Sequence, residues 1–236
     1  MTLSKKRIFI GKVPTLFISE QKTEDSNNRS CVLFYHGFGA SKDIQMEELI
    51  SLASNGFLTI GIDNIGHGDR KYSDFDTKFS EDNPERLQNI IEAVNSTADE
   101  ICNIIDYLIN NKIVKPANIG IVGISMGAFI AYKIPVLENR IKAISAILGT
   151  PEYSFNNIYD YTKKYDIISL LSQNAAKDNI VSSIETKKLH QELRKTFKNP
   201  DDRFKFVEYP NSGHFMNETE WNKCWNLNLQ WLKEKL

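Results

Sequence analysis

Short apolar runs alternate with stretches of helical periodicity along most of this 236-residue sequence. The apolar runs lie at 31–35, 58–62, 119–123, 143–148, 167–172 and 204–208. The helical stretches lie at 41–54, 85–110, 125–133, 185–196 and 218–236. Strands that are apolar throughout are typical of parallel sheets that helices cover on both faces. The alternation therefore predicts an α/β fold with a mostly parallel central sheet.

The remaining segments complete this outline. The runs at 8–10 and 15–19 predict an opening hairpin. No stretch has the composition of an interdomain linker, so we expect a single domain over residues 1–236. A polar segment at 71–84 and an aromatic-rich segment at 151–166 do not fit the alternation. We expect the first to be a loop and the second to be either a short lid or a segment packed on the sheet edge.

The charge balance restricts the partners to expect. Lysine and arginine number 29 against 30 aspartate and glutamate, so no global field attracts nucleic acid or an anionic membrane. The basic residues Lys5, Lys6 and Arg7 precede an apolar run too short for a signal peptide or a membrane span. We expect a cytoplasmic monomer or homodimer that binds neither nucleic acid nor a membrane.

The cysteines and histidines give no sign of a metal site. Cys31, Cys102 and Cys224 lie far apart with no CxxC pair, which predicts reduced thiols rather than disulfides or a zinc site. No two histidines stand at ligand spacing with carboxylates. We therefore expect no metal and no cofactor.

The sequence GISMG at 123–127 continues an apolar run and precedes a candidate helix. A serine at such a strand-to-helix turn adopts a strained backbone that presents its hydroxyl above the sheet, and the flanking glycines leave room for the turn. The first N–H groups of the helix face the same point. This context predicts Ser125 as a nucleophile and the Met126 N–H as a donor to an oxyanion.

One of the four histidines stands where a general base is needed. His214 follows the last predicted strand, so its loop can reach Ser125 at the carboxyl edge of the sheet. We expect His67 to make a structural hydrogen bond. His190 lies within a helix among lysines, and we expect it to be exposed.

The sequence HGFG at 36–39 ends the first parallel strand. We expect His36 to brace this loop. The glycine that follows lets the backbone turn, so that the Phe38 N–H can act as the second oxyanion donor.

A carboxylate is needed to hold the base in the correct tautomer. Asp178 follows the run at 167–172 by a few residues and therefore belongs to the carboxyl edge of the sheet. Asp166 precedes that strand, and Asp201 and Asp202 precede the last one, so these three lie at the opposite edge. Asp178 is the predicted third member.

Five motifs occur in a fixed order along the chain: HGFG, IDNIGHGDR, NIGIVGISMGA, KDNIV and NSGHFM. With them, residues 31–216 resemble the α/β-hydrolase superfamily, in particular its small dienelactone-hydrolase-like and prolyl-oligopeptidase-like serine esterases. The resemblance implies the α/β-hydrolase fold, a triad of Ser125, His214 and Asp178, and backbone donors at Phe38 and Met126. Two features depart from the family pattern: residues 173–176 stand where a His-Gly pair is usual, and Ala128 replaces a frequent glycine.

These observations predict a serine hydrolase that cleaves small carboxylic esters. A peptidase or a thioesterase remains open because the same triad cleaves amides and thioesters, as does a non-catalytic binding module. An ester is favoured because a compact site needs no extended peptide groove, and a serine at position 125 excludes a dehalogenase. The expected pocket residues are Phe38, Met126, Phe215, Tyr153, Phe155, Tyr159 and Tyr161.

Overall fold

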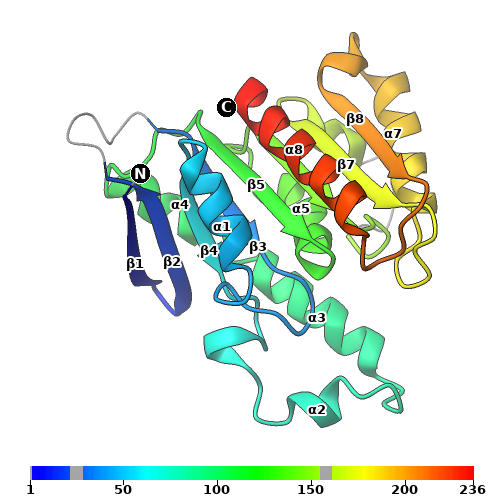
Figure 1. The fold of residues 1–236 in the computed structure, drawn as a ribbon, viewed down its shortest axis with the longest axis horizontal. Coiled ribbons are helices and arrows are strands. Elements are labelled where there is room, and N and C mark those ends of the chain that lie inside the picture. The colour runs from blue at the N-terminus through cyan, green and yellow to red at the C-terminus, as the bar shows by residue number, and fades with distance from the viewer. Residues whose placement is uncertain (1, 22–28, 155–160) are drawn as a thin grey trace.

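The computed structural model describes residues 2–21, 29–154 and 161–236. Within them, eight strands form one sheet in the order β1-β2-β4-β3-β5-β6-β7-β8 (Figure 1). The strands are β1 Leu3–Ile10, β2 Val13–Glu20, β3 Cys31–Tyr35, β4 Leu58–Ile62, β5 Ile119–Ile124, β6 Ala143–Ile147, β7 Ser169–Ala175 and β8 Phe204–Tyr209. The β1–β2 and β2–β4 pairs are antiparallel and every pair from β4 to β8 is parallel. The predicted α/β class and mostly parallel sheet are confirmed.

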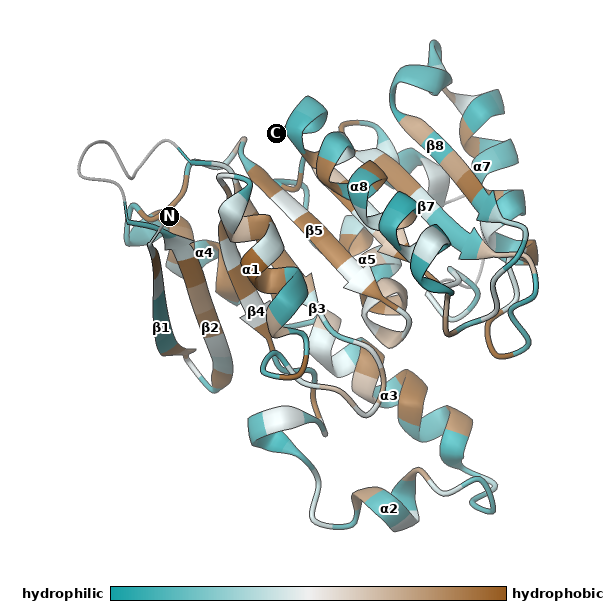
Figure 2. Ribbon diagram, in the orientation of Figure 1, coloured by the Kyte–Doolittle hydropathy of each residue, from teal (hydrophilic) through white to brown (hydrophobic). Residues whose placement is uncertain are grey.

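Helices cover both faces of this sheet. The helices of the described residues are α1 Met46–Ser54, α2 Phe75–Lys78, α3 Arg86–Ala98, α4 Ile101–Asn110, α5 Met126–Leu137, α7 Ile184–Thr196 and α8 Glu218–Lys235. Of these, α2 lies apart from the sheet (Figure 1). Apolar side chains of α3, α4, α5 and α7 share one core with the sheet, whereas α1 and α8 form a second core with the opposite face. Figure 1 shows α1 and α8 in front of the sheet and α4 and α5 behind it. Hydrophobic residues run along β5 between the two layers (Figure 2).

The helical pattern over 85–110 predicts one helix, but the structure contains two. Helix α3 ends at Ala98 and α4 begins at Ile101. Arg70 forms two hydrogen bonds of 2.8 Å with the Glu100 carboxylate at this junction. The junction contains neither glycine nor proline, so no helix-breaking residue marks it. The feature that does mark it is the contact between Glu100 and Arg70.

The segment 71–84 is not the plain polar loop expected from its composition. It contains α2, and the side chain of Phe79 is buried. The phenyl rings of Phe75 and Phe79 lie 4.9 Å apart and face the loop that carries Phe38. Aromatic side chains inside a polar stretch thus form a small core of their own.

Strand β7 extends further than the apolar run at 167–172 suggests, since it continues to Ala175. Asp178 therefore lies three residues beyond the end of the strand.

The single domain over 1–236 stays a prediction. Residues 155–160 of the possible lid lie outside the described residues, and with them Phe155 and Tyr159. No helix among the described residues has the length and apolarity to cross a membrane.

Candidate active site

Ser125 lies between the end of β5 and the start of α5, as the strand-to-helix context predicts. Its backbone has φ 53° and ψ −115°, a conformation that is costly for a residue with a side chain. The Ser125 N–H donates to the Ile147 carbonyl at 2.8 Å, and the Ser125 carbonyl accepts the Ala128 N–H at 2.8 Å. The sheet and the first turn of α5 together hold the strained residue in place.

The two glycines beside Ser125 are required by close backbone approaches. A β-carbon at Gly123 would lie 2.1 Å from the Gly127 carbonyl oxygen. A β-carbon at Gly127 would lie 2.0 Å from the Tyr35 carbonyl oxygen on β3. Any side chain at either position would push α5 away from the sheet and move the serine.

The structure brings together the three predicted triad side chains. Ser125 Oγ lies 2.9 Å from His214 Nε2, and His214 Nδ1 lies 2.8 Å from Asp178 Oδ2. The Asp178 side chain is 1% exposed and that of His214 is 11% exposed. A hydroxyl, an imidazole and a buried carboxylate in this order can move a proton from the serine and stabilise the imidazolium that results.

The loops that carry Asp178 and His214 are joined by backbone hydrogen bonds. Ala176 N–H donates to the Tyr209 carbonyl at 2.9 Å, and Lys177 N–H donates to the Ser212 carbonyl at 3.0 Å. Asp178 Oδ1 accepts the Val181 N–H at 2.8 Å, which fixes the carboxylate within its own turn. The distance between acid and base therefore depends on the pairing of two loops at adjacent strand ends.

Glu220, on the first turn of α8, supports the histidine loop and was missed by sequence reasoning. It accepts hydrogen bonds from the Ser212 hydroxyl and from the Asn211 N–H. The hydrogen bond from Ser212 lowers the pKa of the Glu220 carboxyl. Asn217 accepts the Glu220 N–H at 3.0 Å, so the pair has the spacing of a capping box. That spacing is a signal in the sequence that could have identified Glu220.

The loop after β3 approaches the serine from the other side. A β-carbon at Gly37 would lie 3.6 Å from the Ser125 Cβ, so the two residues are in contact. Within the described residues, the N–H groups of Phe38 and Met126 donate to no protein acceptor. Two free N–H groups at this edge can receive an oxygen that acquires negative charge.

His36 is buried behind this loop rather than in the site. Asn64 N–H donates to His36 Nε2 at 3.0 Å, and the Asn64 side chain donates to the His36 carbonyl at 2.8 Å. Burial lowers the pKa of His36 to about 4. A neutral His36 thus links the ends of β3 and β4, as its position before the loop suggested. His67 Nδ1 lies 3.1 Å from the Ile65 carbonyl oxygen, the kind of structural contact expected for it.

A buried ion pair that sequence reasoning missed lies next to the same loop. Lys42 Nζ is 2.6 Å from Asp63 Oδ2 and 2.6 Å from Asp69 Oδ2. The Lys42 N–H also donates to Asp63 Oδ1 at 2.9 Å. Burial by itself would lower the pKa of Lys42, but the hydrogen bonds to the two carboxylates raise it. Asp63 directly follows an apolar run, and this position at a strand end could have identified it. Nothing in the local sequence marks Lys42 as buried.

The predicted pocket residues are not all near the reacting groups. Phe215 is 88% exposed, with its ring edge-on to His214 at 5.7 Å. The Met126 side chain is buried in the core and does not line an open pocket. Tyr153 packs on Phe129 of α5 at 5.7 Å.

Tyr161 belongs to the core rather than to a lid surface. Its side chain is 4% exposed, and its ring lies 5.4 Å from that of Tyr165. Of the two expectations for the 151–166 segment, a lid or packing on the sheet, the second fits Tyr161.

The prediction of an exposed His190 is wrong. The residue is 3% exposed on the buried face of α7, where its ring lies 5.7 Å from that of Phe206 on β8. Its Nε2 lies 2.8 Å from the Ser172 hydroxyl, which also accepts the Tyr132 hydroxyl at 2.8 Å. Burial lowers the pKa of His190 to about 3. The neighbouring lysines misled the prediction because they share the helix but not its buried face.

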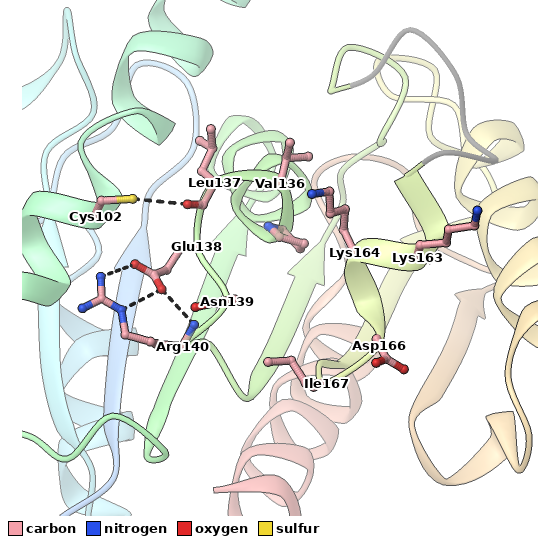
Figure 3. A pocket seen from close by; sticks show the side chains of 11 residues that line it. Cys102, Val136, Leu137, Glu138, Asn139, Arg140, Lys163, Lys164, Asp166 and Ile167 are labelled. Atoms are coloured by element: carbon pink, nitrogen blue, oxygen red, sulfur yellow. Dashed lines mark hydrogen bonds and ion pairs between the residues drawn. The ribbon is translucent and has the colours of Figure 1, made fainter.

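A hollow of about 580 Å³ opens at the opposite edge of the sheet. Figure 3 shows its lining by the end of α5 and the segments that precede β6 and β7. Ser125 follows the carboxyl end of β5, so this hollow is separate from the serine. Among the residues that the structure describes, no three His, Cys, Asp or Glu side chains form a group that could hold a metal ion.

Sequence comparison gives one family and one curated relative. Residues 31–166 match the family described as the alpha/beta hydrolase fold. A relative from Bacillus subtilis (strain 168), named "Putative hydrolase YtaP", is 30% identical over 144 residues. That match covers 56% of this chain and 46% of YtaP, so the chain spans about half the length of this relative.

Solved structures share the fold over nearly the whole chain. TT1662 from Thermus thermophilus has a TM-score of 0.79 at 18% identity, with 99% of both chains covered. P91, a dienelactone hydrolase-like promiscuous phosphotriesterase from metagenomic libraries, has a TM-score of 0.70 at 15% identity. That comparison covers 99% of this chain and 98% of P91.

Proposed function

The chain belongs to the alpha/beta hydrolase fold family, and on that premise we propose that it is a hydrolase that cleaves carboxylic esters of small substrates by a serine mechanism. The observation that carries the proposal is the continuous line of contacts from Ser125 Oγ to His214 Nε2 and from His214 Nδ1 to Asp178 Oδ2, at 2.9 and 2.8 Å. The strained backbone of Ser125 supports the same role, because strain of this kind accumulates where function requires it.

In the proposed acylation step, Ser125 Oγ attacks the carbonyl carbon of the ester while His214 Nε2 accepts the hydroxyl proton. The carbonyl π electrons move to oxygen, and the resulting oxyanion lies near the N–H groups of Phe38 and Met126. When the carbonyl re-forms, the bond to the alcohol breaks and the alcohol takes the proton from His214. Water then attacks the acyl carbon while His214 accepts its proton; the bond to Ser125 Oγ breaks, the serine oxygen takes the proton back from His214, and the acid is released.

Asp178 keeps the proton of His214 on Nδ1, so that Nε2 is free to accept the proton of the serine. The carboxylate also stabilises the imidazolium that exists between the two proton transfers. Its 1% exposure favours this role, because a charge screened by little water acts strongly on its neighbour.

Ester hydrolysis is distinguished from its alternatives by matched substrates. Purified protein is assayed with a p-nitrophenyl ester, an aliphatic thioester and an aminoacyl p-nitroanilide. We expect the highest kcat/KM for the ester. A higher value for the anilide or the thioester would assign the protein to the peptidases or the thioesterases instead.

The serine mechanism is tested by labelling with a fluorophosphonate probe. We expect the probe to label the wild-type protein at Ser125 and Ser125→Ala to lose both labelling and ester hydrolysis. The control is Ser4→Ala, which removes an exposed hydroxyl on β1. An unlabelled and inactive wild-type protein would instead support a binding module without catalysis.

A further inference from the structure

The side chain of Phe38 contacts three other aromatic rings, those of His67, Phe75 and Phe79. We call these four residues the aromatic cluster. The Phe38 ring stacks on Phe75 at 5.6 Å and 29°. It also meets Phe79 and His67 edge-on, each at 5.2 Å. Both geometries are favourable for aromatic pairs. The ring of Phe38 is therefore held from three directions.

The backbone around Phe38 is held on one side of the residue only. Gly37 and Gly39 flank the residue, and Gly39 has φ +73°, so the chain on both sides can rotate more freely than at other residues. The Gly37 carbonyl, which belongs to the same peptide as the Phe38 N–H, accepts the Ala40 N–H at 3.2 Å and lies 2.8 Å from His36 Nδ1. These contacts hold the peptide on its Gly37 side, and the aromatic cluster holds it on its Phe38 side, so the direction of the Phe38 N–H depends on both.

Phe75 and Phe79 are the members of the cluster that come from the 71–84 segment, and Phe75 is the one that stacks on Phe38. It begins α2, which lies apart from the sheet in Figure 1. The segment is attached to α3 by hydrogen bonds from Arg86 Nε to the Phe79 carbonyl and from Asn89 to the Lys78 carbonyl. Through Phe75, this attached segment contacts the loop that faces Ser125.

We propose that Phe75 is a positioning residue: its stack on Phe38, together with the contacts on the Gly37 carbonyl, sets the direction of the Phe38 N–H toward the oxyanion. The proposal rests on the proposed function, in which that N–H is an oxyanion donor. The described ring contacts of Phe75 are with Phe38, His67 and Phe79, so in this proposal it acts on the reaction through Phe38. The α2 segment is in this way part of the machinery for the reaction, although it carries no reacting group.

Phe75 is also the member that can be altered with least damage to the core. His67 and Phe79 are 1% and 5% exposed, and truncating either would leave a cavity. Phe75 is half-buried, so its removal exposes the face of Phe38 without emptying an interior space. Replacement of Phe75 thus separates positioning from folding.

The test compares Phe75→Ala and Phe75→Tyr with wild type, using Phe9→Ala as the control for loss of an exposed phenyl ring on β1. We expect Phe75→Ala to lower kcat by about 10-fold with KM unchanged, part of the 10²–10³-fold that deleting an entire oxyanion donor costs. The affinity for a trifluoromethyl ketone, whose adduct carries an oxyanion, should fall by the same factor. Phe75→Tyr keeps the stack and should restore both, and Phe9→Ala should change neither.

Three results would overturn the positioning role. One is an unchanged kcat in a folded Phe75→Ala protein, and another is a change confined to KM that varies with leaving-group size, which would make Phe75 a substrate contact. The third is a lower kcat with unaltered affinity for the ketone. If Phe75→Ala does not fold, Phe75→Leu replaces it, because Leu keeps apolar bulk without the aromatic face. Failure of the proposed function is distinct, since it would appear as an inactive, unlabelled wild-type protein and would remove this inference with it.

Discussion

The methyl group of Ala128 occupies the space beside Gly149: a β-carbon added at Gly149 would lie 2.3 Å from the Ala128 Cβ. Ala128 stands on the first turn of α5, where the family pattern has a frequent glycine, and it is fully buried. The missing side chain at position 149 therefore makes room for the extra methyl group at position 128. One departure from the pattern is compatible with the fold because of a glycine 21 residues away.

Gly149→Ala is expected to lower the free energy of unfolding by about 1–3 kcal/mol, the usual range for overpacking a core. Ala128→Gly by itself should cost about 1 kcal/mol of helix propensity. Because the second change removes the methyl group that the first one meets, the double variant should lose less stability than the sum of the single variants. Urea denaturation of the four proteins measures this coupling, and strictly additive losses would show that the two positions do not compete for space.

Asp178→Asn should lower kcat for ester hydrolysis by on the order of 10⁴-fold, because an amide in this position favours the wrong tautomer of the base. The carbonyl oxygen of Asn can still accept the Val181 N–H, so the fold should be preserved. Asp166→Asn is the matched control, since Asp166 is exposed and precedes β7 at the other edge of the sheet. Steady-state kinetics decide the matter, and equal activity of the two variants would rule out Asp178 as the orienting acid.

Stability should fall between pH 7 and pH 5 because His190 is neutral when folded. Its pKa of about 3 in the folded protein lies below the value of about 6.5 in an unfolded chain, so the unfolded state binds the proton first as pH falls. The stabilisation is complete above pH 6.5 and is lost as pH falls toward 3. His190→Gln should reduce the stability difference between pH 7 and pH 5 by about 2 kcal/mol.

Urea titrations of wild type and His190→Gln at the two pH values give this difference directly. His36, with a pKa lowered to about 4, adds a similar slope that remains in the variant and serves as an internal reference. An identical pH dependence in the two proteins would mean that folding leaves the pKa of His190 unchanged, and would contradict the prediction.

Lys42→Met should destabilise the protein by about 3–5 kcal/mol, because it leaves the Asp63 carboxylate buried without its counter-charge. Lys188→Met is the contrasting change: its ion pair with Glu185 is exposed, and its loss should cost less than about 1 kcal/mol. The midpoints of urea denaturation measure both. Similar small losses in the two variants would indicate that Asp63 becomes protonated or hydrated when Lys42 is absent.

Local sequence was sufficient for the elements that present the candidate site. The apolar runs that became β3 to β6 and the glycines around Ser125 act through neighbours within a few residues, so their patterns identify them directly. Chain order and the ends of predicted strands singled out Asp178 and His214. The structure then brought these two side chains and Ser125 into contact.

Other features depended on contacts between distant parts of the chain. His190 is buried because it lies on the face of α7 that meets Phe206 of β8 and Ser172 of β7, although its neighbours in sequence are polar. Lys42 and Asp63 are 21 residues apart, and only the packing of α1 and β4 makes their pairing possible. The aromatic residues of 71–84 likewise meet Phe38 only after folding.

The sequence by itself determined the order of strands and helices, the strained turn at Ser125 and the candidates for its partners, because backbone preferences and burial patterns are local properties of the chain. Tertiary structure decided which polar groups are buried together and which loops touch, since those depend on distances between segments far apart in sequence. The stack of Phe75 on Phe38 belongs to this second kind, because no spacing along the chain encodes it.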